Sequence, residues 1–203
     1  CPESVPAPTY QVGDRFTWKY TDGKERVWEV TGLDGNLAQV RWSDGDSRWT
    51  SENEGTYFLD HDWVIRKGIN KKGVAVLSPG LGAFAMMGKK LLDFPLHMGK
   101  AWSLTYAAIG PWGSPMTYVS SLNVVGCEEV VTLAGKFLSL KIENRLAVGG
   151  YTNWALTHLW YSPDAKNIVK IEVVEPFRMV MSPSTGVVIV PIAAYELTRL
   201  DLK

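Results

Sequence analysis

Alternation of apolar and polar side chains over short segments, separated by glycine-containing turns, is the feature that most constrains the fold of this chain. Phe16, Trp18 and Tyr20 alternate with polar neighbours, and the turn dipeptide Asp22-Gly23 follows them. Period-two alternation places these aromatic side chains on one face of a strand, and Asp-Gly is a frequent hairpin connection. Because similar turns recur downstream, residues 10–60 are predicted to form a meander of short antiparallel strands, as in a small barrel.

The same pattern returns in the second half of the chain. Leu138, Leu140 and Ile142 alternate with other residues and share one face of a predicted strand. No segment carries an apolar stripe of helical period over roughly ten or more residues. The predicted fold class is therefore all-β, with the meander followed by a curved antiparallel half-barrel sheet over 101–203. At most one or two short helices are expected, at 84–93.

Residues 61–100 interrupt the strand pattern and differ in charge. They hold 7 Lys and Arg against 2 Asp and Glu, whereas residues 1–60 hold 6 against 11 and residues 101–203 hold 8 of each. This stretch is interpreted as a basic, glycine-rich insert. Its basic side chains are expected to contact an anionic lipid surface or an acidic partner, with a solvated loop as the alternative. The candidates are Arg66, Lys67, Lys71, Lys72, Lys89 and Lys90.

Overall composition excludes several classes of protein. The 21 Lys and Arg balance the 21 Asp and Glu, and a general nucleic-acid binder would carry a basic excess. No apolar run approaches the roughly 18 residues that a spanning helix needs. Two cysteines are too few for a disulfide framework or a cysteine-based zinc site.

Residues 1–9 form a predicted tether that begins with Cys1. Three prolines lie within the first eight residues and suit an extended spacer. Mature bacterial lipoproteins begin in a similar way, with acyl chains on the first cysteine, and two or more chains hold a protein stably at a membrane. Cys1 is therefore the predicted lipidation site. Two alternatives stay open: an accidental boundary that leaves cysteine first, and a disulfide from Cys1 to Cys127, which acylation of the same sulfur would exclude.

Short motifs punctuate strands and turns between residues 94 and 175. They are Phe94-Pro95-Leu96, Gly99-Lys100, Trp102, Glu129-Val130-Val131-Thr132, Ala134-Gly135-Lys136-Phe137, Lys141-Ile142-Glu143, Trp160-Tyr161-Ser162-Pro163-Asp164 and Ile168-Val169-Lys170-Ile171-Glu172. In this order they resemble bacterial periplasmic β proteins of uncharacterised function, whose fold is similar to the curved half-barrels of the outer-membrane lipoprotein-localisation factors. The resemblance implies a cell-envelope location and a binding or structural role, without catalytic residues. The basic insert departs from the family pattern.

Candidate catalytic and metal-binding residues are few. Asp60-His61-Asp62 is the best local cluster for a metal, but neighbours in a strand point to opposite faces, so His61 would face away from both carboxylates. Cys127 precedes Glu128 and Glu129, whose carboxylates disfavour a reactive thiolate. The Gly-x-Ser-x-Gly pattern of a serine nucleophile is absent from the sequence. No catalytic residue, metal or cofactor is therefore predicted.

Aromatic and thioether side chains near turns are the predicted contacts with a protein partner. Exposed rings anchor interfaces or stack on sugars, and flexible methionines adapt to a partner surface. The candidates are Trp49, Trp63, Phe84, Met86, Met87 and Trp112.

The predicted function is that of a non-enzymatic, lipid-anchored cell-envelope protein, acting as an accessory or scaffolding subunit of a larger assembly. The expected location is the periplasmic side, with the outer membrane favoured. The expected partners are the membrane, through acyl chains on Cys1, and protein subunits, but not nucleic acid. One alternative is a periplasmic carrier that binds an apolar ligand or lipid in a groove lined by the inward residues of 137–173. Another is an envelope enzyme of unrecognised type.

Overall fold

The computed structural model describes residues 2–44, 55–60, 64–70, 89–109, 115–149, 154–182, 186–190 and 194–203. The strands are β1 (Arg15–Tyr20), β2 (Glu25–Asp34), β3 (Leu37–Asp44), β4 (Gly55–Leu59), β5 (Ile65–Asn70), β6 (Ala101–Ile109), β7 (Pro115–Thr132), β8 (Gly135–Val148), β9 (Trp154–Ser162), β10 (Asn167–Glu175), β11 (Phe177–Ser182), β12 (Gly186–Val190) and β13 (Tyr195–Asp201). None of the described residues is helical, and none therefore forms a helix that could span a bilayer. The part of the candidate helix before residue 89 lies outside the described residues.

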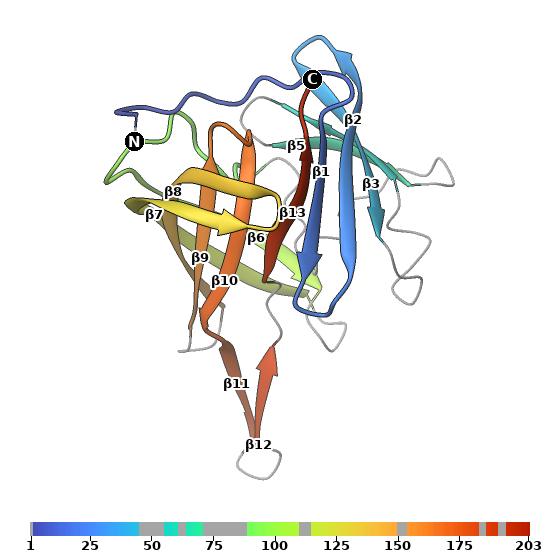
Figure 1. The fold of residues 1–203 in the computed structure, drawn as a ribbon. Coiled ribbons are helices and arrows are strands. Elements are labelled where there is room, and N and C mark those ends of the chain that lie inside the picture. The colour runs from blue at the N-terminus through green and yellow to red at the C-terminus, as the bar shows by residue number, and fades with distance from the viewer. Residues whose placement is uncertain are drawn as a thin grey trace.

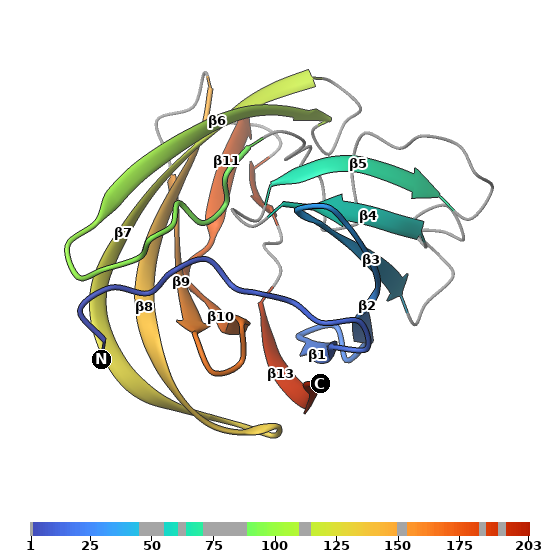
Figure 2. The same cartoon turned by 90° about the horizontal axis from the view of Figure 1, so that it is seen from above.

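Eleven strands form one antiparallel sheet in the order β5-β4-β3-β2-β1-β13-β10-β9-β8-β7-β6. The sheet curves round on itself without closing (Figures 1 and 2). Strand β1 pairs with β13, from Arg15 opposite Asp201 to Tyr20 opposite Tyr195. The N-terminal meander and the C-terminal half therefore belong to a single sheet. The prediction of an all-β fold with a curved antiparallel sheet is confirmed.

Glycines supply the backbone conformation that the first turns need. Gly23 and Gly35 have φ values of 82° and 56°, a region that strains residues with a Cβ atom. Gly23 N–H donates to the carbonyl of Tyr20 at 2.9 Å, which closes the turn between β1 and β2. The predicted turn at Asp22-Gly23 is confirmed.

Aromatic side chains fill the concave side of the first strands. Trp18 stacks on Phe16 at 5.7 Å between ring centroids, and Trp28 meets the edges of both Trp18 and Trp42 at 5.4 Å. All four rings are buried. The indole N–H of Trp18 donates to the carbonyl of Ile168 at 3.0 Å, so the aromatic row also ties β1 to β10 across the interior.

The N-terminal segment packs against the sheet from its fifth residue. Val5 is 1% exposed, and its backbone exchanges two hydrogen bonds with Leu96, of 2.7 and 2.8 Å. Phe94 meets Tyr161 of β9 edge-on, at 5.3 Å between ring centroids. Residues 2–12 and 89–100 thus cross one end of the curved sheet together (Figure 2). The segment predicted to be a spacer is, from Val5 onward, part of the folded body.

Candidate functional site

The outer side of the sheet is shaped by a long hairpin that folds back over it. Strands β7 and β8 pair over most of their length, but β8 pairs with β9 only from Leu140 onward. Their shared end, residues 128–139, is called the distal hairpin here, and it crosses in front of β9 and β10 (Figure 1). At its tip, Ala134 N–H donates to the carbonyl of Leu197 in β13 at 3.3 Å. The hairpin is therefore fastened to the central strands.

Trp160 is the main contact beneath the distal hairpin. Its indole N–H donates to Glu128 Oε1 at 2.7 Å. The ammonium groups of Lys141 and Lys170 lie 5.3 and 5.0 Å from its ring centroid. Lys141 also pairs with Glu128 at 3.7 Å. Cation–π contacts and a charge-assisted hydrogen bond thus hold an aromatic ring that is only 4% exposed on the outer side of β9.

The outward face of the distal hairpin mixes exposed apolar side chains with one charge pair. Val131 and Leu133 are 64% and 72% exposed, and Leu138 is 45% exposed. Glu129 stands opposite Leu138, and Lys136 stands opposite Val131. The Glu129 carboxylate and the Lys136 ammonium form an ion pair of 3.4 Å. These three apolar side chains, called the hairpin patch here, are therefore accompanied by a single neutralised charge pair.

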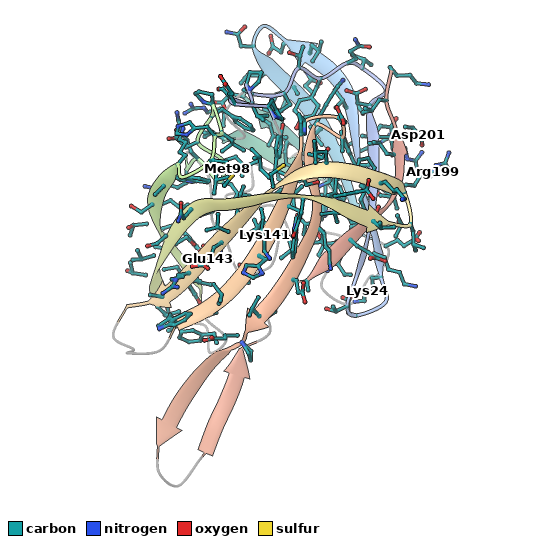
Figure 3. The ribbon with its side chains drawn as sticks, turned by 60° about the vertical axis from the view of Figure 1, so that its left-hand side comes forward. Lys24, Met98, Lys141, Glu143, Arg199 and Asp201 are labelled. Atoms are coloured by element: carbon teal, nitrogen blue, oxygen red, sulfur yellow. The ribbon has the colours of Figure 1, made fainter. Side chains whose placement is uncertain are left out.

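A row of charged residues runs beside Trp160. His158 of β9 stands opposite Glu143 of β8 on one side and Glu172 of β10 on the other. Figure 3 shows Lys141 and Glu143 on the same face of β8. Burial of the imidazole lowers the pKa of His158 and Lys141 lowers it further, whereas the carboxylates raise it. The imidazole is therefore held in its neutral form more strongly than a free histidine.

The residues first considered for a metal have a structural role where they are described. Asp60 is 7% exposed and accepts from the Arg66 guanidinium at 2.6 and 2.7 Å and from the Val64 N–H at 2.9 Å. These contacts close the connection between β4 and β5. His61 and Asp62 lie outside the described residues. No group of three or more potential metal ligands is present within the described parts of the chain.

The predicted contact residues fall mostly where the chain is not described. Trp49, Trp63, Phe84, Met86, Met87, Trp112, Lys71 and Lys72 all lie outside the described residues, as does Cys1. Of the basic candidates, Lys89 and Lys90 are exposed, and Lys90 pairs with Asp93 at 3.4 Å. Lys67 lies in β5, and Arg66 is exposed but engaged by Asp60. The four members that the structure describes, Arg66, Lys67, Lys89 and Lys90, lie in two separate segments, and the remaining predictions are untested.

Sequence reasoning missed the hairpin patch. Its one local signal is Leu133, a large apolar residue in the turn Leu133-Ala134 that joins β7 to β8. Turns are ordinarily polar, so an apolar residue there indicates either a buried tip or a contact surface.

Several of the inward residues expected to line a carrier's groove are packed in the core. Leu140, Ile142, Leu159 and Ile168 are each 3% exposed or less and belong to one continuous hydrophobic core with Phe94.

Cys127 of β7 is disulfide-bonded in the structure. This is the state that the disulfide alternative for Cys1 requires. Disulfides persist in oxidising compartments such as the bacterial periplasm and are rare in the cytosol.

Comparisons with known proteins give distant structural likenesses only. No protein-family model matches this sequence, and no curated protein is significantly similar to it. The hypothetical lipoprotein YmcC from Escherichia coli is 8% identical with a TM-score of 0.46, over 93% of this chain and 85% of YmcC. A candidate lipoprotein from Parabacteroides distasonis is 10% identical with a TM-score of 0.48, over 98% of this chain and 100% of that one.

A candidate exported protein with a YmcC-like fold, from Bacteroides fragilis, is 15% identical with a TM-score of 0.40, over 99% of this chain and 100% of that one. At these identities and TM-scores the likenesses carry no argument about function. The similarity to lipoprotein-localisation factors stays a prediction.

Proposed function

We propose that this chain is a non-catalytic binding protein of the bacterial cell envelope, an accessory subunit that docks a protein partner through the hairpin patch. The observation that supports this proposal is the exposure of Val131, Leu133 and Leu138 on one outward face. Large apolar side chains gathered on a surface are typical of interaction sites.

The energetics favour a protein partner at this patch. Removing a Val or Leu side chain from water contributes about 1.5–3 kcal/mol, so three such residues offer the core of a modest interface. Glu129 and Lys136 lie among these side chains, and their mutual ion pair reduces the cost of covering the charges. Because the distal hairpin is fastened by Trp160 and Leu197, the patch is presented on a fixed support, which lowers the entropic cost of docking.

The envelope location is proposed on the two states open to Cys1. Acyl chains there would hold the chain at a membrane, and a disulfide with Cys127, which is bonded in the structure, persists in an oxidising compartment such as the periplasm. The acyl anchor on Cys1 is the proposed attachment, and a Cys1–Cys127 bond is the competing state, because both need the same sulfur. Intact-mass measurement of the protein from native membranes separates them. Added mass of acyl chains on the N-terminal peptide supports the anchor, whereas a peptide pair joined by a disulfide overturns it and leaves the proposed location unchanged.

Docking is tested with a photo-crosslinking residue in place of Leu133 in the full chain, expressed in its native host. An adduct with one distinct envelope protein is expected, and it should be absent when the same residue replaces Leu33, which is 54% exposed on β2. With that protein purified, Val131→Lys should weaken binding at least about tenfold, and Leu33→Lys should leave it unchanged. Adducts with lipid or with the chain itself alone would overturn the proposal.

A further inference from the structure

Little free chain lies between Cys1 and the folded body. Val5 is 1% exposed, and it forms an antiparallel bridge with Leu96 through hydrogen bonds of 2.7 and 2.8 Å. Cys1 precedes Val5 by four residues, and four extended residues span at most about 14 Å. Acyl chains on Cys1 would therefore enter a bilayer close to the point where Val5 is fixed.

Backbone hydrogen bonds show which surface lies at this point. Because the bridge from Val5 is antiparallel, the residues before it run beside residues 97–98. Gly99 N–H donates to the carbonyl of Val124 at 2.9 Å, and Val124 N–H donates to the carbonyl of Lys100, also at 2.9 Å. The N-terminal segment, the chain that leads into β6 and the middle of β7 therefore meet at one corner of the molecule.

Exposed apolar and basic side chains lie at this corner. Met98 is 52% exposed, and Val125, the residue after the one that bonds to Gly99, is 42% exposed. Lys89 and Lys90 are exposed in the segment that carries Met98. These four side chains, Lys89, Lys90, Met98 and Val125, are called the anchor corner here.

The charges at the anchor corner favour an anionic surface. The ammonium groups of Lys90 and Lys100 both pair with Asp93, at 3.4 and 3.0 Å, so two cations share one carboxylate. Lys89 adds a third cation, and Glu3 is the acidic residue of the N-terminal segment. Three lysines against two carboxylates leave an excess of one positive charge, which anionic lipid headgroups attract.

The short linking chain indicates a bilayer surface as the occupant of this corner. An acyl chain on Cys1 brings the bilayer there, so a protein or a second copy would have to share the corner with lipid. A body that is already held by acyl chains meets the lipid surface at a high effective concentration. A few basic and apolar side chains then suffice to favour one orientation of that body.

We propose that the anchor corner lies on the anionic surface of the bilayer that holds the acyl chains, which fixes the orientation of the whole body. Met98 and Val125 enter the headgroup region, and Lys89 and Lys90 face lipid phosphates. The turn between β1 and β2, at the end of the body away from the N-terminus, then faces water (Figures 1 and 3). This inference deepens the proposed function and rests on its acyl anchor at Cys1.

The test uses the acylated full chain, purified from native membranes and reconstituted into vesicles of phosphatidylcholine and phosphatidylglycerol. A fluorescent amino acid replaces Met98 or, as the matched position in the β1–β2 turn, Lys24 (Figure 3). Lipid that carries a spin label on its headgroup quenches a fluorophore at the membrane surface. Quenching at Met98 is expected to exceed quenching at Lys24 at least about threefold.

Paired substitutions test the contribution of charge. Lys89→Gln together with Lys90→Gln should reduce quenching at Met98 at least about twofold, because each basic residue near an anionic surface contributes to its attraction. The matched control is Lys19→Gln together with Lys24→Gln, which removes the same charge from β1 and its turn. This control should leave quenching at Met98 unchanged.

Equal quenching of the acylated protein at Met98 and Lys24, or equal losses in the two paired variants, would overturn the orientation alone. A chain from native membranes whose mass shows no acyl groups would overturn the anchor and the orientation together. Crosslinking at Leu133 reports separately on the hairpin patch and is independent of both outcomes.

Discussion

Asp14 has no exposed surface, yet three separate parts of the chain donate to it. Its carboxylate accepts from the Lys166 ammonium at 3.0 Å and from the backbone N–H groups of Gln11 and Lys203, each at 2.9 Å. One side chain thus joins the entry to β1, the turn between β9 and β10, and the C-terminal end. The buried Asp14 carboxylate therefore stabilises the contact between these three segments.

Asp14→Ala is expected to lower the free energy of unfolding by about 2–4 kcal/mol. The substitution leaves the partly buried Lys166 ammonium and the backbone N–H groups of Gln11 and Lys203 without their acceptor. Chemical denaturation followed by tryptophan fluorescence measures the loss. The matched control is Asp201→Ala, whose pair with Arg199 is exposed, and which should change stability by less than about 1 kcal/mol. Equal losses of unfolding free energy in the two variants would show that Asp14 does not hold these three segments together.

His158 is expected to titrate below the usual value for histidine. Burial is the largest cause of its lowered pKa and Lys141 is the next, against Glu143, Glu172 and Glu128. Because the folded pKa lies below the unfolded one of about 6.5, the unfolded state takes up its proton first as pH falls. The stability that His158 contributes is therefore complete above about pH 6.5 and is lost as pH falls toward the folded pKa.

Lys141→Met should raise the pKa of His158 by removing the cation, as measured by NMR titration of its imidazole protons. Lys136→Met is the control, since Lys136 pairs with Glu129 in the distal hairpin. A His158 pKa that is unchanged in Lys141→Met, or that moves equally in both variants, would show that Lys141 does not act on it.

Among the elements, the distal hairpin depends on Trp160. Trp160→Phe keeps an aromatic ring but removes the hydrogen bond to Glu128 Oε1, which is expected to lower stability by about 1–2 kcal/mol. Hydrogen exchange of the amides in residues 129–138 should quicken more than exchange in β1 and β2, because the hairpin loses its fastening first. Trp154→Phe, at a side chain 39% exposed, should leave exchange in 129–138 unchanged. If hydrogen exchange quickened equally in all strands of the sheet, the role of Trp160 would not be confined to the distal hairpin.

The same hairpin shows why alternation predicts strands better than it predicts buried faces. Leu138, Leu140 and Ile142 share one face of β8, yet Leu138 is 45% exposed while the other two are at most 1% exposed. Before Leu140, β8 no longer pairs with β9 but still pairs with β7, and the hairpin covers the outer side of the sheet. The opposite face of β8, with Phe137 and Ser139, is therefore the buried one there. Alternation is local, whereas the fold-back is set by Trp160 and Leu197, which are distant in the sequence.

For the whole molecule, the sequence predicts the class and the curved sheet but not that the two halves of the chain join in one sheet. The turns and the alternating segments on either side of the basic insert are local signals, and the structure has strands there. The pairing of β1 with β13 joins residues far apart in the chain, and no short-range pattern specifies such a partner. The three N-terminal prolines indicated a spacer, and that local signal was outweighed by the burial of Val5 in the core.

Val5 offers a test of whether the N-terminal segment is part of the cooperative fold. Val5→Asp places a carboxylate at a site that is 1% exposed, and it is expected to cost at least about 2 kcal/mol of unfolding free energy. Val12→Asp, at a side chain 55% exposed, should change stability by less than about 0.5 kcal/mol. If the segment were a spacer, both variants would unfold like the wild type. Because Val5 bonds to Leu96 across one end of the sheet, the Val5 variant should instead unfold earlier in a single transition, seen equally by tryptophan fluorescence and far-ultraviolet circular dichroism.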